Sequence, residues 1–214
     1  MSSAVEAFHR YRVDCPIIAI LRGIAPDEVV PVGETLIAAG IRIIEIPLNS
    51  PDPFESIRRL SKSVGDRGLV GAGTVLQIEQ VARVQDAGGQ LVVSPNTDVS
   101  VIQKTVGTGL VSIPGYFTPS EAFAAIAAGA HGIKLFPAEA ATPAVVKAQR
   151  AVLPNDVPLL VVGGVTADDL GRWLAAGADG FGLGGALYRA GDTAPQVRQR
   201  ANRFVAALQS SVGQ

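Results

Sequence analysis

The feature that most constrains the fold is a short apolar run, rich in β-branched residues, that recurs at a regular spacing along the whole chain. An alanine-rich segment with helical periodicity follows each run, which is the rhythm of parallel strands joined by helical crossovers. Several runs are apolar almost throughout, as strands buried on both faces should be. The eight runs are Ile17–Leu21, Arg42–Ile46, Leu69–Gly73, Leu91–Ser94, Leu110–Ile113, Gly132–Phe136, Leu159–Val162 and Gly180–Leu183.

The ends of the expected helices repeat as well. An Ala-Gly pair precedes the next run at Ala39-Gly40, Ala87-Gly88, Ala128-Gly129 and Ala176-Gly177. Glycine suits the left-handed position that ends a helix. Eight β/α units without a linker predict one α/β domain over residues 1–214, a TIM (β/α)₈ barrel. We expect the segment before the first run to form a helix that caps the N-terminal end of the barrel.

The alternative architecture is a doubly wound open sheet. Its dinucleotide signal, Gly-x-Gly-x-x-Gly after the first strand, is missing, because the turn there reads Arg22-Gly23-Ile24.

Composition excludes several classes of function. The chain has 18 basic and 19 acidic residues, so neither a nucleic acid nor a membrane surface is an expected partner. No apolar run is long enough for a membrane helix, although 48% of residues are hydrophobic. One cysteine and no secretory pattern predict a cytoplasmic protein. The two histidines lie in no metal-ligand spacing, so we expect no metal site.

Lys134 is the strongest candidate for chemistry. It lies in the run Gly132–Phe136, where Ile133 and Leu135 have the opposite parity and can face the helices. Lys134 and Phe136 then face the interior, where burial lowers the pKa of an amine and lets it attack a ketone to form an imine. The structural alternatives are a lysine that reaches solvent or one that is merely paired with Glu45.

Glu45 is the natural partner of this lysine. The period of two within Ile41–Pro47 places Ile44 and Ile46 under the helices and Glu45 toward the interior. There it can serve as general base and acid. The alternative role is a salt bridge that only neutralises Lys134 or Arg22.

Other polar groups and glycines end the same runs. Gly163-Gly164 and Gly184-Gly185 follow the last two runs, where backbone N–H groups of this barrel commonly bind phosphate, although glycine also makes tight turns. Arg22 can hold a substrate carboxylate or orient Glu45, unless it is an ordinary loop arginine. Thr74 offers a hydroxyl at the open end of the barrel, unless it caps a helix.

Six ordered motifs together resemble one enzyme family over nearly the whole chain. They are Leu21-Arg22-Gly23, Glu45-Ile-Pro-Leu-Asn-Ser50, Gly71-Ala-Gly-Thr74, Ser94-Pro95-Asn96, Ile133-Lys-Leu-Phe-Pro137 and Val162-Gly-Gly164. The chain is similar to the KDPG/KDPGal aldolases, which cleave phosphorylated 2-keto-3-deoxy sugar acids through a Schiff base.

The resemblance implies a role for each matched residue. Lys134 would form the Schiff base, and Glu45 would be the general acid and base. The other implied positions would bind substrate. The residues around the pyruvate half would be Arg22, Thr74, Pro95 and Phe136. The residues around the other half of the substrate, which ends in the phosphate, would be Val162, Gly163, Gly164, Gly184 and Gly185.

The resemblance also implies a homotrimer without metal or organic cofactor. Asn49 and Val162 match the galactonate branch, whereas the gluconate branch carries arginine and threonine there. We therefore expect cleavage of 2-dehydro-3-deoxy-6-phosphogalactonate to pyruvate and D-glyceraldehyde 3-phosphate. Gly185 departs from the usual serine, which removes one hydrogen bond to phosphate.

Four other functions are weighed against this expectation. The first is cleavage of the gluconate epimer, alone or with dual specificity. The second is a phosphosugar isomerase or epimerase with Glu45 as the enolising base. The third is a non-catalytic sensor of phosphorylated ligands, against which the interior Lys/Glu pair argues, and the fourth is a metal-dependent aldolase.

Overall fold

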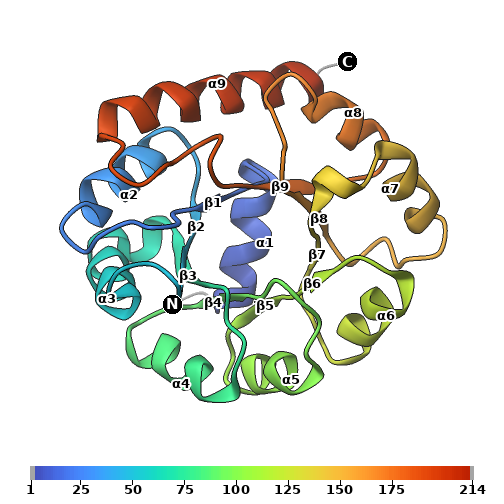
Figure 1. Ribbon diagram of the computed structural model, residues 1–214, viewed down its shortest axis with the longest axis horizontal. Coiled ribbons are helices and arrows are strands. Elements are labelled where there is room, and N and C mark those ends of the chain that lie inside the picture. The colour runs from blue at the N-terminus through green and yellow to red at the C-terminus, as the bar shows by residue number, and fades with distance from the viewer. Residues whose placement is uncertain (1–2, 213–214) are drawn as a thin grey trace.

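The computed structural model describes residues 3–212 and confirms the α/β barrel, a ring of parallel strands surrounded by helices (Figure 1). The strands are β1 (Ile17–Ile20), β2 (Ile43–Pro47), β3 (Leu69–Gly73), β4 (Leu91–Val93), β5 (Val111–Ile113), β6 (Gly115–Tyr116), β7 (Ile133–Leu135), β8 (Leu159–Val162) and β9 (Gly180–Leu183). The helices are α1 (Ala4–Asp14), α2 (Val29–Ala38), α3 (Pro53–Val64), α4 (Ile78–Asp86), α5 (Val99–Gly107), α6 (Pro119–Ala127), α7 (Pro143–Arg150), α8 (Leu170–Ala175) and α9 (Ala194–Val212). Two short 3₁₀ turns, Gly65–Arg67 and Ala138–Ala140, complete the described elements.

One strand of the ring is broken in a way that the sequence pattern did not predict. The sheet order is β5-β4-β3-β2-β1-β9-β8-β7-β6, and only Pro114 separates β5 from β6. Proline has no N–H to donate to the hydrogen bonds between neighbouring strands, so the strand is interrupted there. On one side of the interruption β5 pairs with β4, and on the other side β6 pairs with β7. The carbonyl of Pro114 still accepts a 2.9 Å hydrogen bond from the N–H of Lys134. The barrel is therefore nearly closed, and the fifth predicted run continues beyond Ile113.

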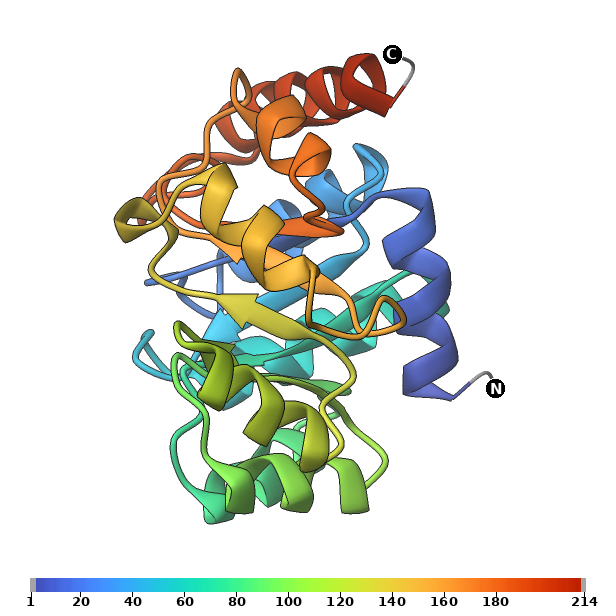
Figure 2. The same ribbon diagram turned by 90° about the vertical axis from the view of Figure 1, so that its right-hand side faces the viewer.

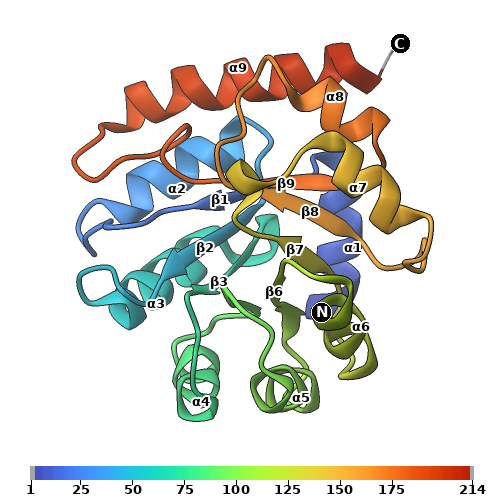
Figure 3. The same cartoon turned by 45° about the vertical axis from the view of Figure 1, so that its right-hand side comes forward.

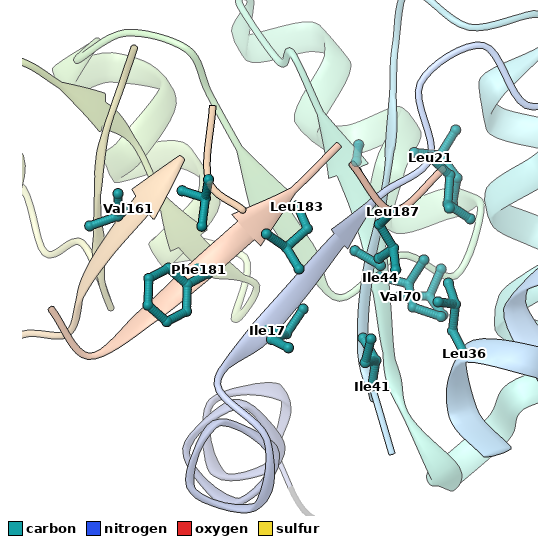
Figure 4. Close-up of a cluster of buried hydrophobic side chains, with 14 of the residues drawn as sticks. Ile17, Leu21, Leu36, Ile41, Ile44, Val70, Val161, Phe181, Leu183 and Leu187 are labelled. Carbon is teal, nitrogen blue, oxygen red and sulfur yellow. The ribbon is translucent and has the colours of Figure 1, made fainter. Parts of the chain in front are cut away.

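Side chains alternate between two apolar layers, as the period of two predicted. Ile44, on β2, packs between the sheet and the surrounding helices together with Ile17 and Phe181 (Figure 4). Ile43, one residue earlier, packs inside the ring with Leu69 and other strand residues. This alternation decides which polar side chains of the strands enter the barrel.

Helix α1 covers the N-terminal end of the barrel, as expected. Its Phe8 and Tyr11 are buried against the interior layer that contains Ile18 and Leu69. Figure 2 shows α1 on one side of the strands and the loops after their carboxyl ends on the other. A capping box between Ser3 and Glu6 begins this helix. This helix leaves the carboxyl-terminal end of the barrel uncovered.

The Ala-Gly helix ends adopt the conformation that was expected of them. Gly40, Gly88, Gly129 and Gly177 have φ values of 94°, 81°, 93° and 102°. Glycine adopts this left-handed region without the cost of a Cβ clash. Helix α9 then closes the outer layer by packing against α2 and α8 (Figure 3). Among the described residues, no helix has the length and apolar character needed to span a membrane.

Candidate active site

Lys134 and Glu45 both lie inside the barrel. Lys134 is the middle residue of β7, and its neighbours Ile133 and Leu135 belong to the layer beneath the helices. Glu45 is the middle residue of β2, between Ile44 and Ile46 of the same outer layer. Lys134 is 7% exposed and Glu45 is 2% exposed. The parity argument therefore places both side chains correctly.

A glycine on the neighbouring strand makes room for the glutamate. Gly73 ends β3 and is paired in register with Pro47 of β2. A Cβ atom added to Gly73 would lie 1.9 Å from Oε2 of Glu45, so any larger residue would displace the carboxylate. The same Oε2 atom is buried and has no hydrogen-bond partner in the part of the chain that the structure describes. Glu45 thus presents a free oxygen to the interior.

Burial shifts the acid and the amine toward their neutral forms. Desolvation raises the pKa of Glu45 to about 7, although the positive charges of Lys134 and Arg22 oppose this rise. Desolvation also lowers the pKa of Lys134, with Glu45 opposing and Arg22 assisting. No ion pair joins Glu45 to Lys134 within residues 3–212, so the structure does not show the salt bridge considered as an alternative. Near neutral pH such a pair can exchange protons and supply an uncharged amine.

Phe136 contacts the lysine and also borders a cavity at this end of the barrel. The Nζ atom of Lys134 lies 4.6 Å from the centroid of the Phe136 ring. Phe136 also lines a cavity of about 460 Å³ that opens over the ends of β8 and β9. The predicted site residues that line this cavity are Arg22, Phe136, Val162, Gly163, Gly164, Gly184 and Gly185. Lys134 and Glu45 are not among the lining residues.

Arg22 is exposed, yet it is held in place. Its guanidinium donates a 2.6 Å hydrogen bond to Oδ1 of Asn49, in the loop after β2. The adjacent Gly23 N–H donates to Oγ of Ser50 at 2.9 Å. These two bonds join the loops after β1 and β2, so Arg22 is a positioned cation rather than an unconstrained loop arginine.

Thr74 and Pro95 are not among the residues that line the cavity. Thr74 follows β3 with a φ of 56° and is half-buried, and it does not cap a helix, because α4 begins at Ile78 with Gln77 as its N-cap. The carbonyl of Pro95 lies 2.4 Å from where a Cβ on Gly115 would be. Gly115 is paired in register with Lys134, so the backbone of Pro95 packs against the strand next to the lysine.

Two charged lining residues were not predicted from the sequence. Glu139 lies in the 3₁₀ turn after β7, and Arg189 follows β9 and donates a 3.1 Å hydrogen bond to the carbonyl of Gly185. Both belong to loops at the carboxyl ends of strands, which is the signal that would have found them.

No group of three or more His, Cys, Asp or Glu side chains that could hold a metal ion occurs in the described part of the chain. His131 lies at the other end of β7, where its Nδ1 accepts a 3.1 Å hydrogen bond from the N–H of Ser112.

Comparison with known proteins finds a matching family model, two similar relatives and a similar solved structure. The family model described as KDPG and KHG aldolase matches residues 10–196. A probable 2-dehydro-3-deoxy-6-phosphogalactonate aldolase of Rhizobium meliloti (strain 1021) is 49% identical over 92% of this chain and 93% of its own length. The 2-dehydro-3-deoxy-6-phosphogalactonate aldolase of Escherichia coli (strain K12) is 45% identical over 95% of this chain and 99% of its own length. A solved native KDPGal structure has a TM-score of 0.92 and 46% identity, over 93% of this chain and 97% of that one.

Proposed function

Because this chain belongs to the KDPG and KHG aldolase family, we propose that it cleaves 2-dehydro-3-deoxy-6-phosphogalactonate through a Schiff base on Lys134. It is an aldehyde-lyase, and the two relatives of 45% and 49% identity carry this substrate in their names. The observation that carries the mechanism is the buried pair formed by Lys134 and Glu45, whose pKa values shift toward the neutral amine and the neutral acid.

The reaction begins with the amine. Neutral Lys134 adds to the C2 ketone, the neutral form of Glu45 gives its proton to the departing hydroxyl, and loss of water leaves a protonated imine. Glu45, now a carboxylate, removes the proton of the C4 hydroxyl directly or through one water molecule. The C3–C4 bond then breaks, its electron pair moves into the imine to form an enamine, and C4 leaves as the aldehyde of D-glyceraldehyde 3-phosphate. Protonation of the enamine at C3 and hydrolysis of the imine release pyruvate and restore Lys134.

The binding groups are distributed along the length of the substrate. We assign the C1 carboxylate to Arg22, because a positioned guanidinium pairs well with a carboxylate. We assign the pyruvate half to Thr74, Pro95 and Phe136, and the contact of Phe136 with Lys134 supports this assignment. The glycine-rich ends of β8 and β9 take the phosphate, where backbone N–H groups can approach an oxyanion.

The choice between epimers at C4 rests on two residues. Asn49 holds Arg22, and Val162 lines the cavity where a gluconate-type enzyme carries a threonine hydroxyl. The match of both residues to the galactonate branch, together with the names of the two relatives, supports the galactonate preference.

A comparison of cleavage rates tests the function directly. The galactonate and gluconate epimers would be supplied with and without the 6-phosphate, and pyruvate release would be measured. We expect the phosphorylated galactonate epimer to have the highest kcat/KM. A faster gluconate epimer would reassign the substrate, and isomerisation without pyruvate release would refute an aldolase.

We further propose that the enzyme is a cytoplasmic homotrimer that needs no metal or organic cofactor. Exposed apolar side chains on neighbouring elements support a contact between copies, and they are Leu76, Ile78, Val99, Phe117 and Phe123. The single, buried Cys15 supports a reducing compartment. Light scattering at working concentration measures the assembly, and full activity after treatment with a chelator would support metal independence.

A further inference from the structure

Thr74 has a backbone conformation that threonine rarely adopts. It follows the last residue of β3 and has a φ of 56°, which lies in the left-handed region. Asp52 is the other non-glycine residue with a positive φ in the described part of the chain, but it is exposed at the start of α3, and aspartate tolerates this region. Threonine is branched at Cβ, so the same conformation strains it. Strained residues persist only where the surrounding structure holds them, and they cluster at functional sites.

Ser94 holds the residue that follows Thr74. Val75 is fully buried, and its N–H donates a 3.3 Å hydrogen bond to the carbonyl of Val93, the last residue of β4. Its own carbonyl accepts a 2.7 Å hydrogen bond from Oγ of Ser94, which is 4% exposed. This carbonyl has no other partner among residues 3–212. Loss of the Ser94 hydroxyl would therefore leave a buried carbonyl unpaired, which the chain can avoid only by moving the segment that contains Thr74.

The residue before Thr74 lies against the proposed acid. A Cβ atom on Gly73 would overlap the carboxylate of Glu45, and the carbonyl of Gly73 accepts a 2.8 Å hydrogen bond from the N–H of Leu48. Thr74 itself is half-buried, and its hydroxyl forms no hydrogen bond with another residue in the described part of the chain. The strained residue is thus the immediate neighbour of the point where Glu45 packs, and its hydroxyl is available to a ligand.

We propose that Ser94 is a positioning residue, which holds Thr74 in its strained conformation through the carbonyl of Val75 and so presents the Thr74 hydroxyl to the pyruvate half of the substrate. Ser94 acts through Thr74 and does not itself touch the substrate. This inference rests on the proposed function, in which Thr74 is assigned to the pyruvate half, but the hold on Thr74 can be measured without turnover.

The test is a double-mutant cycle of activity between Ser94→Ala and Thr74→Ala. We expect Ser94→Ala to lower kcat/KM for the phosphorylated keto acid about tenfold while Thr74 is present. In the Thr74→Ala background the same change should have no further effect, because the hydroxyl that Ser94 positions is gone. Ser94→Cys, which has a similar shape but a weak donor, should lose activity in the same direction and covers the case in which Ser94→Ala fails to fold.

Thr105→Val is the matched control. The hydroxyl of Thr105 is also buried, and it donates a hydrogen bond of the same 2.7 Å to the carbonyl of Val101 within α5. Its removal should lower stability as Ser94→Ala does, yet it should leave kcat/KM unchanged. The comparison separates loss of a buried hydrogen bond from loss of the position of Thr74.

Two measurements examine the hold on Thr74 without turnover. Thr74→Gly should raise the urea midpoint of unfolding by about 0.5 M, because glycine adopts this conformation without strain. Hydrogen exchange of the Val75 amide should become about tenfold faster in Ser94→Ala, because Val75 then keeps only one of its two backbone hydrogen bonds.

An equal loss of activity for Ser94→Ala with and without the Thr74 hydroxyl would overturn the proposal, because Ser94 would then only support the fold. Unchanged exchange of the Val75 amide, or a lower midpoint in Thr74→Gly, would also overturn it. A wild type that shows both effects on Thr74 and Val75 but never releases pyruvate would refute the proposed function and leave the hold of Ser94 on Thr74 supported.

Discussion

At the scale of single residues, burial is the common cause of the chemistry assigned to Glu45 and Lys134. Loss of water around each group raises the pKa of the acid and lowers that of the amine. Arg22 opposes the first shift and assists the second, because its positive charge disfavours another cation nearby. The substrate carboxylate would neutralise Arg22 on binding, so we expect the two pKa values to depend on occupancy.

The pKa of Glu45 predicts how stability depends on pH. The folded protein holds this proton up to about pH 7, whereas the unfolded chain releases it near the ordinary value of 4.5. The contribution of this bound proton to the stability of the folded protein is therefore complete below pH 4.5, and it is lost as the pH rises to about 7.

The free energy of unfolding of the wild type, minus that of Glu45→Gln, should fall by roughly 3 kcal/mol over this interval. Urea unfolding of both proteins at several pH values measures the difference. Parallel curves for the two proteins would show that Glu45 titrates normally.

Gly185 offers a test by addition of a hydroxyl. Its surroundings are open, so Gly185→Ser should fold normally and place a hydroxyl at the end of β9, which is part of the proposed phosphate site. A hydrogen bond to a charged group is worth about 1.5–3 kcal/mol, so we expect KM for the phosphorylated substrate to fall about tenfold or more. The unphosphorylated analogue serves as the control, and an unchanged KM ratio would place the phosphate elsewhere.

At the scale of elements, strand parity explains why Lys134 and Glu45 could be located from the sequence. An alternation of buried faces repeats every two residues and fixes which side chains enter the barrel. The position of Glu139 could not be predicted in this way, because the turn after β7 has no such period. The strand β6 beyond Pro114 was also missed, because Pro114-Gly115 looks like the end of a strand.

Gly73 shows how one strand positions the side chain of another, here the carboxylate that we propose as the acid and base. A methyl group at this position would overlap the Glu45 carboxylate, so Gly73→Ala should displace it. We expect kcat to fall about 100-fold, as misplacement of a catalytic group by about 1 Å commonly causes. Gly107→Ala, on α5, is the matched control because a Cβ there meets no atom within 4 Å. Equal activity of the two variants would contradict the assigned geometry.

Helix α1 should contribute stability without taking part in the chemistry. Phe8 is fully buried in the interior layer, so Phe8→Ala should lower the free energy of unfolding by about 3–5 kcal/mol. Val13 of the same helix is 75% exposed, and Val13→Ala should change it by less than about 0.5 kcal/mol. Urea unfolding compares the two variants, and a small loss in Phe8→Ala would mean that α1 is not part of the folded core.

At the scale of the whole molecule, the two ends of the barrel have separate tasks. The N-terminal end is closed by α1, and the carboxyl end carries the cavity together with the loops that hold Arg22, Glu139 and Arg189. This division follows from the parallel strands, which bring all their carboxyl ends to one side. It also explains why a pattern of eight runs was enough to predict the architecture, and why we expected a site at the end where the cavity lies.

The most direct measurement of the central claim is borohydride trapping with pyruvate, followed by peptide mass spectrometry. Reduction of the imine would fix a three-carbon adduct on the peptide that contains Lys134, and Lys134→Ala would carry no adduct and would lose nearly all cleavage activity. An adduct on another lysine, or full turnover in Lys134→Ala, would contradict the account.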